Sequence, residues 1–125
     1  MSDIELPDSI SNLAGKLQIV EIVWQGVPFQ IPKFAVYSIL DNPVFDRFMY
    51  RNGRRIALLK LGRYEIPVID PFRGNIDKPP EHVVIITHSK EDRFGLYGYP
   101  ADHVADDLIV ASNHRSVKCI VKDFV

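Results

Sequence analysis

The stretch RRIALLKLGRYEIPVIDPFRG, residues 54–74, decides the fold. Its first arm, residues 56–61, is a nearly continuous apolar run. Its second arm has two alternating faces, with Tyr64, Ile66 and Val68 on one and Glu65, Pro67 and Ile69 on the other. Gly62-Arg63 separates the arms, and glycine accepts the positive φ that a tight reversal needs. The stretch therefore predicts a two-stranded hairpin that ends in a Pro-Val-Ile-Asp exit.

The residues before this hairpin predict further strands. Residues 17–24 are apolar and rich in β-branched side chains, Gln25-Gly26 supplies a turn, and residues 27–32 alternate apolar with other side chains. Pro28 lacks an N–H, so it fits best on an edge strand. Residues 1–15 show no clear period, and we expect a loose N-terminal arm there.

The residues after the hairpin continue the pattern. Residues 73–80 predict a loop, and short strands are predicted within residues 82–88, 93–99, 108–110 and 117–125. Gly95 and Gly98 interrupt a strand pattern, which indicates a bulge or a close approach by another chain segment. The whole predicts a single mainly β domain over residues 16–125, closed as a barrel and carrying one short helix.

The short helix is expected after Asn42-Pro43, with Asn as N-cap and Pro in the first helical position. Phe45, Phe48 and Met49 would share one helical face, and Asn52-Gly53 would end the helix. Asn52-Gly53 as the turn of a hairpin is the alternative, which we rank second because Asn42-Pro43 would then have nothing to cap.

Composition limits the function classes. The chain has 125 residues, 46% of them hydrophobic, and a net charge of −1 from 15 basic and 16 acidic residues. This balance argues against a nucleic-acid binder, which usually has a basic domain. One cysteine allows no internal disulfide, no secretory signal opens the chain, and no apolar run approaches 18 residues. We expect a cytoplasmic protein that does not insert into a membrane.

The residues that often carry chemistry do not form a recognisable constellation. The four histidines (His82, His88, His103 and His114) lack metal-ligand spacing, and Cys119 lies on the apolar face of a predicted strand. The acidic cluster of Asp102, Asp106 and Asp107 lacks the spacing of a calcium loop. Asp70 follows a strand directly and predicts an Asx turn. We therefore expect no catalytic residue, no metal and no cofactor.

Aromatic and basic residues are the candidates for an exposed recognition surface, because Tyr and Arg are favoured interface anchors. They are Tyr37, Tyr64, Phe72, Arg63, Arg73, Tyr97 and Tyr99.

Three segments resemble the CheW-like domain, the coupling adaptor of chemotaxis. In residues 18–40, QIVEIVWQGVPFQIPKFAVYSIL, Val36 and Ile39 match the family's x-V-x-E-I segment, with Ser38 in place of Glu. Residues 59–72, LKLGRYEIPVIDPF, are similar to N-L-R-G-x-x-x-P-V-x-D-L, and the matching residues are Pro67, Val68 and Asp70. VVIIT followed by RFGLYGY resembles the family's next strand pair, with Gly95 and Leu96 in place.

The resemblance implies a fold of two small β-barrels (SH3-like subdomains) packed against each other, without enzymatic activity. It implies an adaptor that couples a chemoreceptor, or a regulator of a type IV pilus, to the regulatory domain of a histidine kinase. Carried over by matched position, the interface residues are Val36, Gly62 and Arg63. The family's Arg-Gly corner reads Gly62-Arg63 here, so the two residues are exchanged.

Two other functions are kept as alternatives. A small β-barrel that binds a small molecule, or works as a minor enzyme, requires a concave pocket with convergent polar groups. A nucleic-acid binder with an OB-like fold would use aromatic side chains on strands, although this chain lacks the basic excess.

Overall fold

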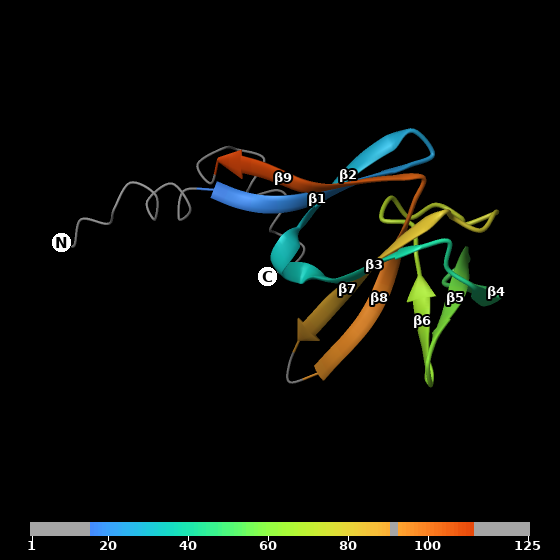
Figure 1. Cartoon of the computed structure of the whole chain (residues 1–125). Helices are drawn as coiled ribbons and strands as arrows, with labels where there is room; N and C mark the ends of the chain where they lie inside the picture. The colour runs from blue at the N-terminus through green and yellow to red at the C-terminus, as the bar shows by residue number, and fades with distance from the viewer. Residues whose placement is uncertain (1–15, 91–92, 112–125) are drawn as a thin grey trace, which may run out of the picture.

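The computed structural model of the chain describes residues 16–90 and 93–111 (Figure 1). The predicted N-terminal arm, residues 1–15, and the predicted last strand, residues 117–125 with Cys119, lie outside the described residues.

The described residues are mainly β, as the sequence predicts. In chain order the elements are β1 (Lys16–Trp24), β2 (Val27–Pro32), the 3-10 helix η1 (Lys33–Ala35), β3 (Val36–Asp41), β4 (Phe45–Arg51), β5 (Arg54–Leu61), β6 (Tyr64–Val68), β7 (His82–Lys90), β8 (Arg93–Ala101) and β9 (His103–Ala111). They form a three-stranded sheet, β2-β1-β9, and a six-stranded sheet, β3-β7-β8-β6-β5-β4. Figure 1 shows β1, β2 and β9 gathered beside one end of the long β7–β8 hairpin, with β4–β6 at its side. Neither sheet is a closed barrel among the described strands, so the two predicted barrels are not confirmed.

The β7–β8 hairpin is buried on both faces along residues 83–86 of β7 and residues 98–101 of β8. Successive side chains of a strand point to opposite faces, so the side chains of Val83–Ile86 pack alternately into two different cores. Val84 and Ile86 belong to what we call the outer core, against the three-stranded sheet. Val83 and Ile85 belong to the inner core, within the curve of the six-stranded sheet. This double burial explains the uninterrupted apolar run, because such a strand has no solvent face.

Each core gathers side chains from distant parts of the chain. The outer core contains Val20, Ile22, Ile31, Ala35, Val84, Ile86, Tyr99 and Ala101. The inner core contains Trp24, Ala57, Leu59, Ile66, Val68, Ile76, Val83 and Ile85. Leu40 of β3 and Phe45 of β4 both pack against the inner core, although these two strands lie at opposite ends of the sheet order. The six-stranded sheet therefore curls around the inner core.

The two hairpins expected from the sequence are present. Gln25 and Gly26 have positive φ between β1 and β2, and Gly62 has φ +60 between β5 and β6. β2 is an edge strand, as Pro28 predicts. At the exit of β6, the Asp70 carboxylate accepts a hydrogen bond from the Phe72 N–H at 2.7 Å, which confirms the Asx turn.

The predicted helix over residues 43–52 is wrong, because this segment is β4 and Asn52-Gly53 turns it into β5. Asn42 has φ +49, a left-handed conformation unlike the extended one of an N-cap. Its N–H donates to the Glu81 carbonyl at 2.7 Å, so it ends β3 instead of opening a helix.

The helix-like spacing in β4 has a different cause. The pairing of β4 with β5 shifts register between Phe45 and Arg47. This bulge adds one residue and brings Phe45 and Phe48, three apart, to the same inner core. A strand with a bulge can therefore show the spacing of three residues between apolar side chains that is typical of a helix.

Gly98 on β8 is required by the packing of the inner core. A Cβ on this residue would lie 2.7 Å from Val83 Cγ1 and 3.2 Å from Val68 Cγ2. Gly95 is on the same strand, and a Cβ there would meet nothing within 4 Å. The close approach predicted for these glycines is thus present at Gly98.

We expect Gly98→Ala to lower the free energy of unfolding by about 1–3 kcal/mol, because the inner core must move to admit the methyl group. Gly95→Ala is the matched control and should change it by less than about 0.5 kcal/mol. Urea unfolding with an unchanged m-value measures both. Equal effects at the two positions would contradict this account of the core.

Candidate protein-interaction surface

The three predicted interface residues have different environments. Gly62 and Arg63 are exposed at the tip of the β5–β6 hairpin. Val36 is half-buried, packs against the outer core and is paired with Ile86 of β7. The hairpin tip is thus exposed to solvent, whereas Val36 contributes to the packing of the outer core.

Tyr37 follows Val36 and is pushed outward by a bulge. The pairing of β3 with β7 advances from Val36–Ile86 to Ser38–Ile85, so Tyr37 is the extra residue. A bulge re-aims a side chain, and the Tyr37 side chain is 59% exposed. The structure therefore presents a tyrosine one position beyond the predicted valine.

Tyr64 follows Arg63 and is 72% exposed. It has the strand parity of Ile66 and Val68, which lie in the inner core. Because Tyr64 is the first residue of β6, its ring stands at the open end of that core. The alternation in the sequence correctly places Tyr64 on this face. Burial along the face begins at Ile66, two residues later, so Tyr64 remains exposed.

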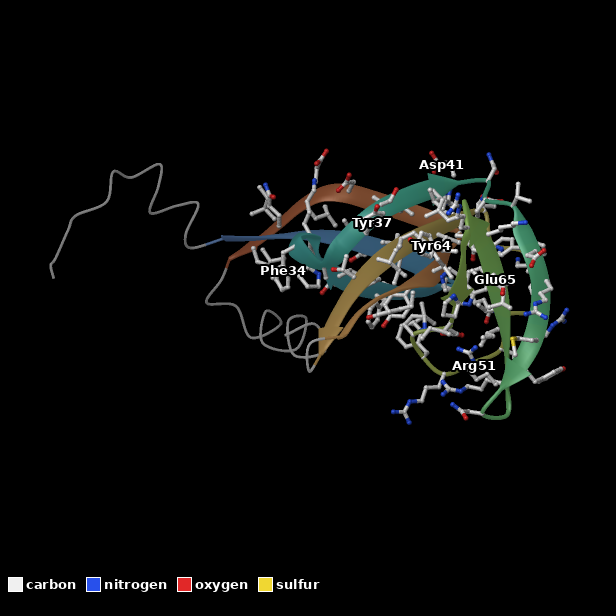
Figure 2. All side chains as sticks on the ribbon, turned by 90° about the horizontal axis from the view of Figure 1, so that it is seen from below. Phe34, Tyr37, Asp41, Arg51, Tyr64 and Glu65 are labelled. Carbon is white, nitrogen blue, oxygen red and sulfur yellow. The ribbon has the colours of Figure 1, made fainter. Side chains whose placement is uncertain are left out.

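Tyr37 and Tyr64 line the same cavity, which has a volume of about 360 Å³. We call it the tyrosine cavity. Its other walls are Glu65 and Ile66 of β6 and Gly95 and Leu96 of β8. Ile66 and Leu96 contribute to the inner core, so this cavity lies at the edge of that core, which we call its mouth. Figure 2 shows Tyr37, Tyr64 and Glu65 on one side of the molecule, with Phe34 beyond Tyr37.

One charged group of this surface, Glu65, is part of an ion pair. Glu65 lies 3.6 Å from the Arg47 guanidinium on β4, and both side chains are largely exposed. Such exposed pairs contribute little to stability, and Glu65 lines the tyrosine cavity together with Tyr64. The surface thus combines exposed rings with a carboxylate that has a neighbouring cation.

The predicted acidic cluster is divided by the structure. Asp106 and Asp107 lie 3.2 and 3.5 Å from Lys33 Nζ, which joins η1 to β9. The hydrogen bond to Asp106 raises the pKa of Lys33 above its usual value, and the nearby negative charges add to this effect. Asp102 instead accepts a hydrogen bond from the Gln25 N–H at 3.0 Å and supports the β1–β2 turn.

The histidines described by the structure do not converge. His82 Nδ1 lies 2.7 Å from the Asp41 carboxylate, across the β3–β7 pairing. His103 is exposed on β9, and His114 lies outside the described residues. Within residues 16–90 and 93–111, no group of three or more His, Cys, Asp or Glu side chains is placed to hold a metal ion.

The other predicted recognition residues are dispersed. Phe72 and Arg73 are exposed on the loop after β6, Tyr97 is half-buried and Tyr99 is buried. Sequence reasoning did not select Phe34, which is 58% exposed, or Glu65 and Leu96 of the tyrosine cavity. Nothing local distinguishes these residues from ordinary surface or core positions.

The sequence matches no protein-family model, and a search of curated proteins finds no match. In the described part of the chain, every helix is too short or too polar to cross a membrane.

We expect Tyr64→Ser to leave the free energy of unfolding within about 0.5 kcal/mol of the wild type, because most of the ring is in solvent. Ile66→Ala, two residues further along the same face, should cost about 2–5 kcal/mol because that side chain is fully buried. Urea denaturation of the two variants measures the difference. A large loss of stability in Tyr64→Ser would show that the ring belongs to the core.

Proposed function

We propose that this chain is a non-enzymatic adaptor of the CheW-like type in a cytoplasmic chemosensory pathway, serving chemotaxis or type IV pilus twitching motility. It would couple a chemoreceptor or pilus-system regulator to the regulatory domain of a histidine kinase. The proposal rests on the three matched segments and on the exposed tyrosine cavity beside two of the matched positions.

The observation that carries the proposal is the pair of exposed tyrosines around one cavity. Tyr37 follows the matched Val36, and Tyr64 follows the matched Arg63. Residues from two separate matched segments thus meet at the mouth of the inner core. Tyrosine supplies a large contact area with a polar tip, which suits a protein interface.

The two cores support the finer part of the proposal. A CheW-like domain has two small SH3-like barrels, and this chain has two separate cores on opposite faces of β7–β8. We assign the inner core to one barrel and the outer core to the other. Val36 would act by holding Tyr37 in the bulge, while Gly62 and Arg63 would touch the partner directly.

We expect Arg63→Glu and Tyr64→Ala each to weaken binding of a purified kinase regulatory domain or receptor signalling tip from the same organism. Loss of an interface anchor costs about 2 kcal/mol, or roughly 30-fold in Kd. Isothermal titration calorimetry with both candidate partners measures the effect.

Tyr50→Ala is the matched control. Tyr50 is also 72% exposed, but it lies on β4 and does not line the tyrosine cavity. Its loss should change Kd less than twofold. Absence of binding by the wild type to either partner would contradict the adaptor function. Equal effects of Tyr50→Ala and Tyr64→Ala would contradict only the choice of surface.

A further inference from the structure

A second cavity, of about 450 Å³, lies beside the turn of the β4–β5 hairpin. We call it the arginine cavity, because Arg51 and Arg54 line it from the two sides of that turn. No described residue lines both this cavity and the tyrosine cavity. Pro67 and Ile69 border it, whereas the tyrosine cavity lies beside Glu65 and Ile66, nearer the start of β6. In Figure 2 Arg51 is well separated from Tyr37 and Tyr64.

The turn places the two arginines opposite each other. Arg51 and Arg54 are cross-strand partners in the pairing of β4 with β5. Asn52 and Gly53 between them have φ values of +53 and +76, as a two-residue turn with two left-handed residues requires. Directly opposed residues send their side chains to the same face, and like charges there are destabilising. The hairpin thus carries a repulsive pair where an uncharged pair would be more stable.

Neither arginine has a carboxylate partner among the described residues that would relieve this repulsion. Among residues 16–90 and 93–111, no carboxylate forms an ion pair with Arg51 or Arg54. Neighbouring arginines are engaged: Arg47 pairs with Glu65, and the Arg55 guanidinium lies 4.6 Å from the centre of the Phe48 ring. Of the four arginines on β4 and β5, the two that line the cavity therefore have no such contact within the described part of the chain.

The carboxylate in the cavity wall, that of Asp70, makes its hydrogen bond to the loop that follows β6. Asp70 is only 8% exposed, and one of its oxygens accepts the Phe72 N–H at 2.7 Å. The other oxygen faces Gly74, where an added Cβ would lie 2.5 Å from it. Asp70 holds the loop that forms one wall and forms no ion pair with Arg51 or Arg54.

The opposite wall is aromatic and firmly packed. Tyr97 and Tyr99 of β8 line the cavity, and their rings meet edge to face with centroids 5.3 Å apart. Tyr99 also packs edge to face on Phe29 at 5.3 Å. Ile69 adds an apolar surface. A cavity with such walls and a few convergent polar groups has the usual make-up of a small-ligand site.

We infer that the arginine cavity binds a small oxyanion, a phosphate ester or a carboxylate, that carries a flat apolar group. The guanidinium groups of Arg51 and Arg54 bind the oxyanion, since their planar forks match the geometry of phosphate and carboxylate. The flat group packs against Tyr97 and Ile69. The ligand's charge offsets the repulsion between the arginines, which makes binding more favourable than at a single cation.

Phenyl phosphate and benzoate are the probes, with benzyl alcohol as the neutral counterpart. Calorimetric titration of the full chain should give a Kd of about 1 mM or tighter for at least one anion, and no binding of the alcohol. The double variant Arg51→Gln/Arg54→Gln should weaken this binding at least tenfold. Arg47→Gln, which removes a cation of the same hairpin outside the cavity, should change it less than twofold. NMR shifts on binding should centre on Gly53, Gly74 and Tyr97.

Three results would overturn the inference: no binding of either anion, equal binding by the double variant, or equal weakening by Arg47→Gln. A measurement without ligand adds an independent check. If the arginines serve a ligand, the double variant should unfold at a urea concentration no lower than the wild type, because the repulsive pair is gone. A lower midpoint would show that they hold the hairpin instead. None of these outcomes depends on the adaptor function.

Discussion

Val83–Ile86 on β7 send alternate side chains into two different cores, and the rest of the described structure is arranged to cover them. One face receives β1, β2 and η1, and the other is enclosed by β4–β6 as the sheet curls. β8 shares this position, with Tyr99 in the outer core and Gly98 lying directly against Val83 and Val68. Because both faces of this part of the hairpin are buried, its register has little freedom, since a shift by one residue would exchange the contents of both cores. The two cores are thus coupled through one hairpin.

The parts of the fold that the sequence predicts are those set by local chemistry. Gln25-Gly26 and Gly62-Arg63 mark real turns, Pro28 lies on an edge strand, and Asp70 forms the expected Asx turn. The helix prediction failed because the register bulge after Phe45 depends on pairing with β5, which local pattern does not reveal. Asn52-Gly53 is a strong hairpin signal, and both residues have the positive φ of the turn that joins β4 to β5. Ile76 is also fully buried within a segment that reads only as loop.

The candidate surface was predictable in part. Alternation along the β5–β6 hairpin put Tyr64 on the face of Ile66 and Val68, and the hairpin tip placed Arg63 in solvent. The exposure of Tyr37 follows from a bulge between β3 and β7, which are over 40 residues apart in the chain and pair only in the folded sheet. The cross-strand pairing of Arg51 with Arg54 likewise cannot be predicted if the segment is interpreted as a helix. Sites built from cross-strand geometry require the register, and register is a tertiary property.

The curled sheet leaves two outer strands, β3 and β4, that find no further strand partner among the described residues. Unpaired strand edges are templates for edge-to-edge association between molecules. Each of these two strands carries a bulge, and each has exposed charge at or near it, Asp41 on β3 and Asp46 and Arg47 on β4. A bulge interrupts the regular ladder of donors and acceptors that an incoming strand must match. The irregularities that shape the surface at Tyr37 and the inner core at Phe45 therefore also make these two edges poor templates for pairing with another molecule.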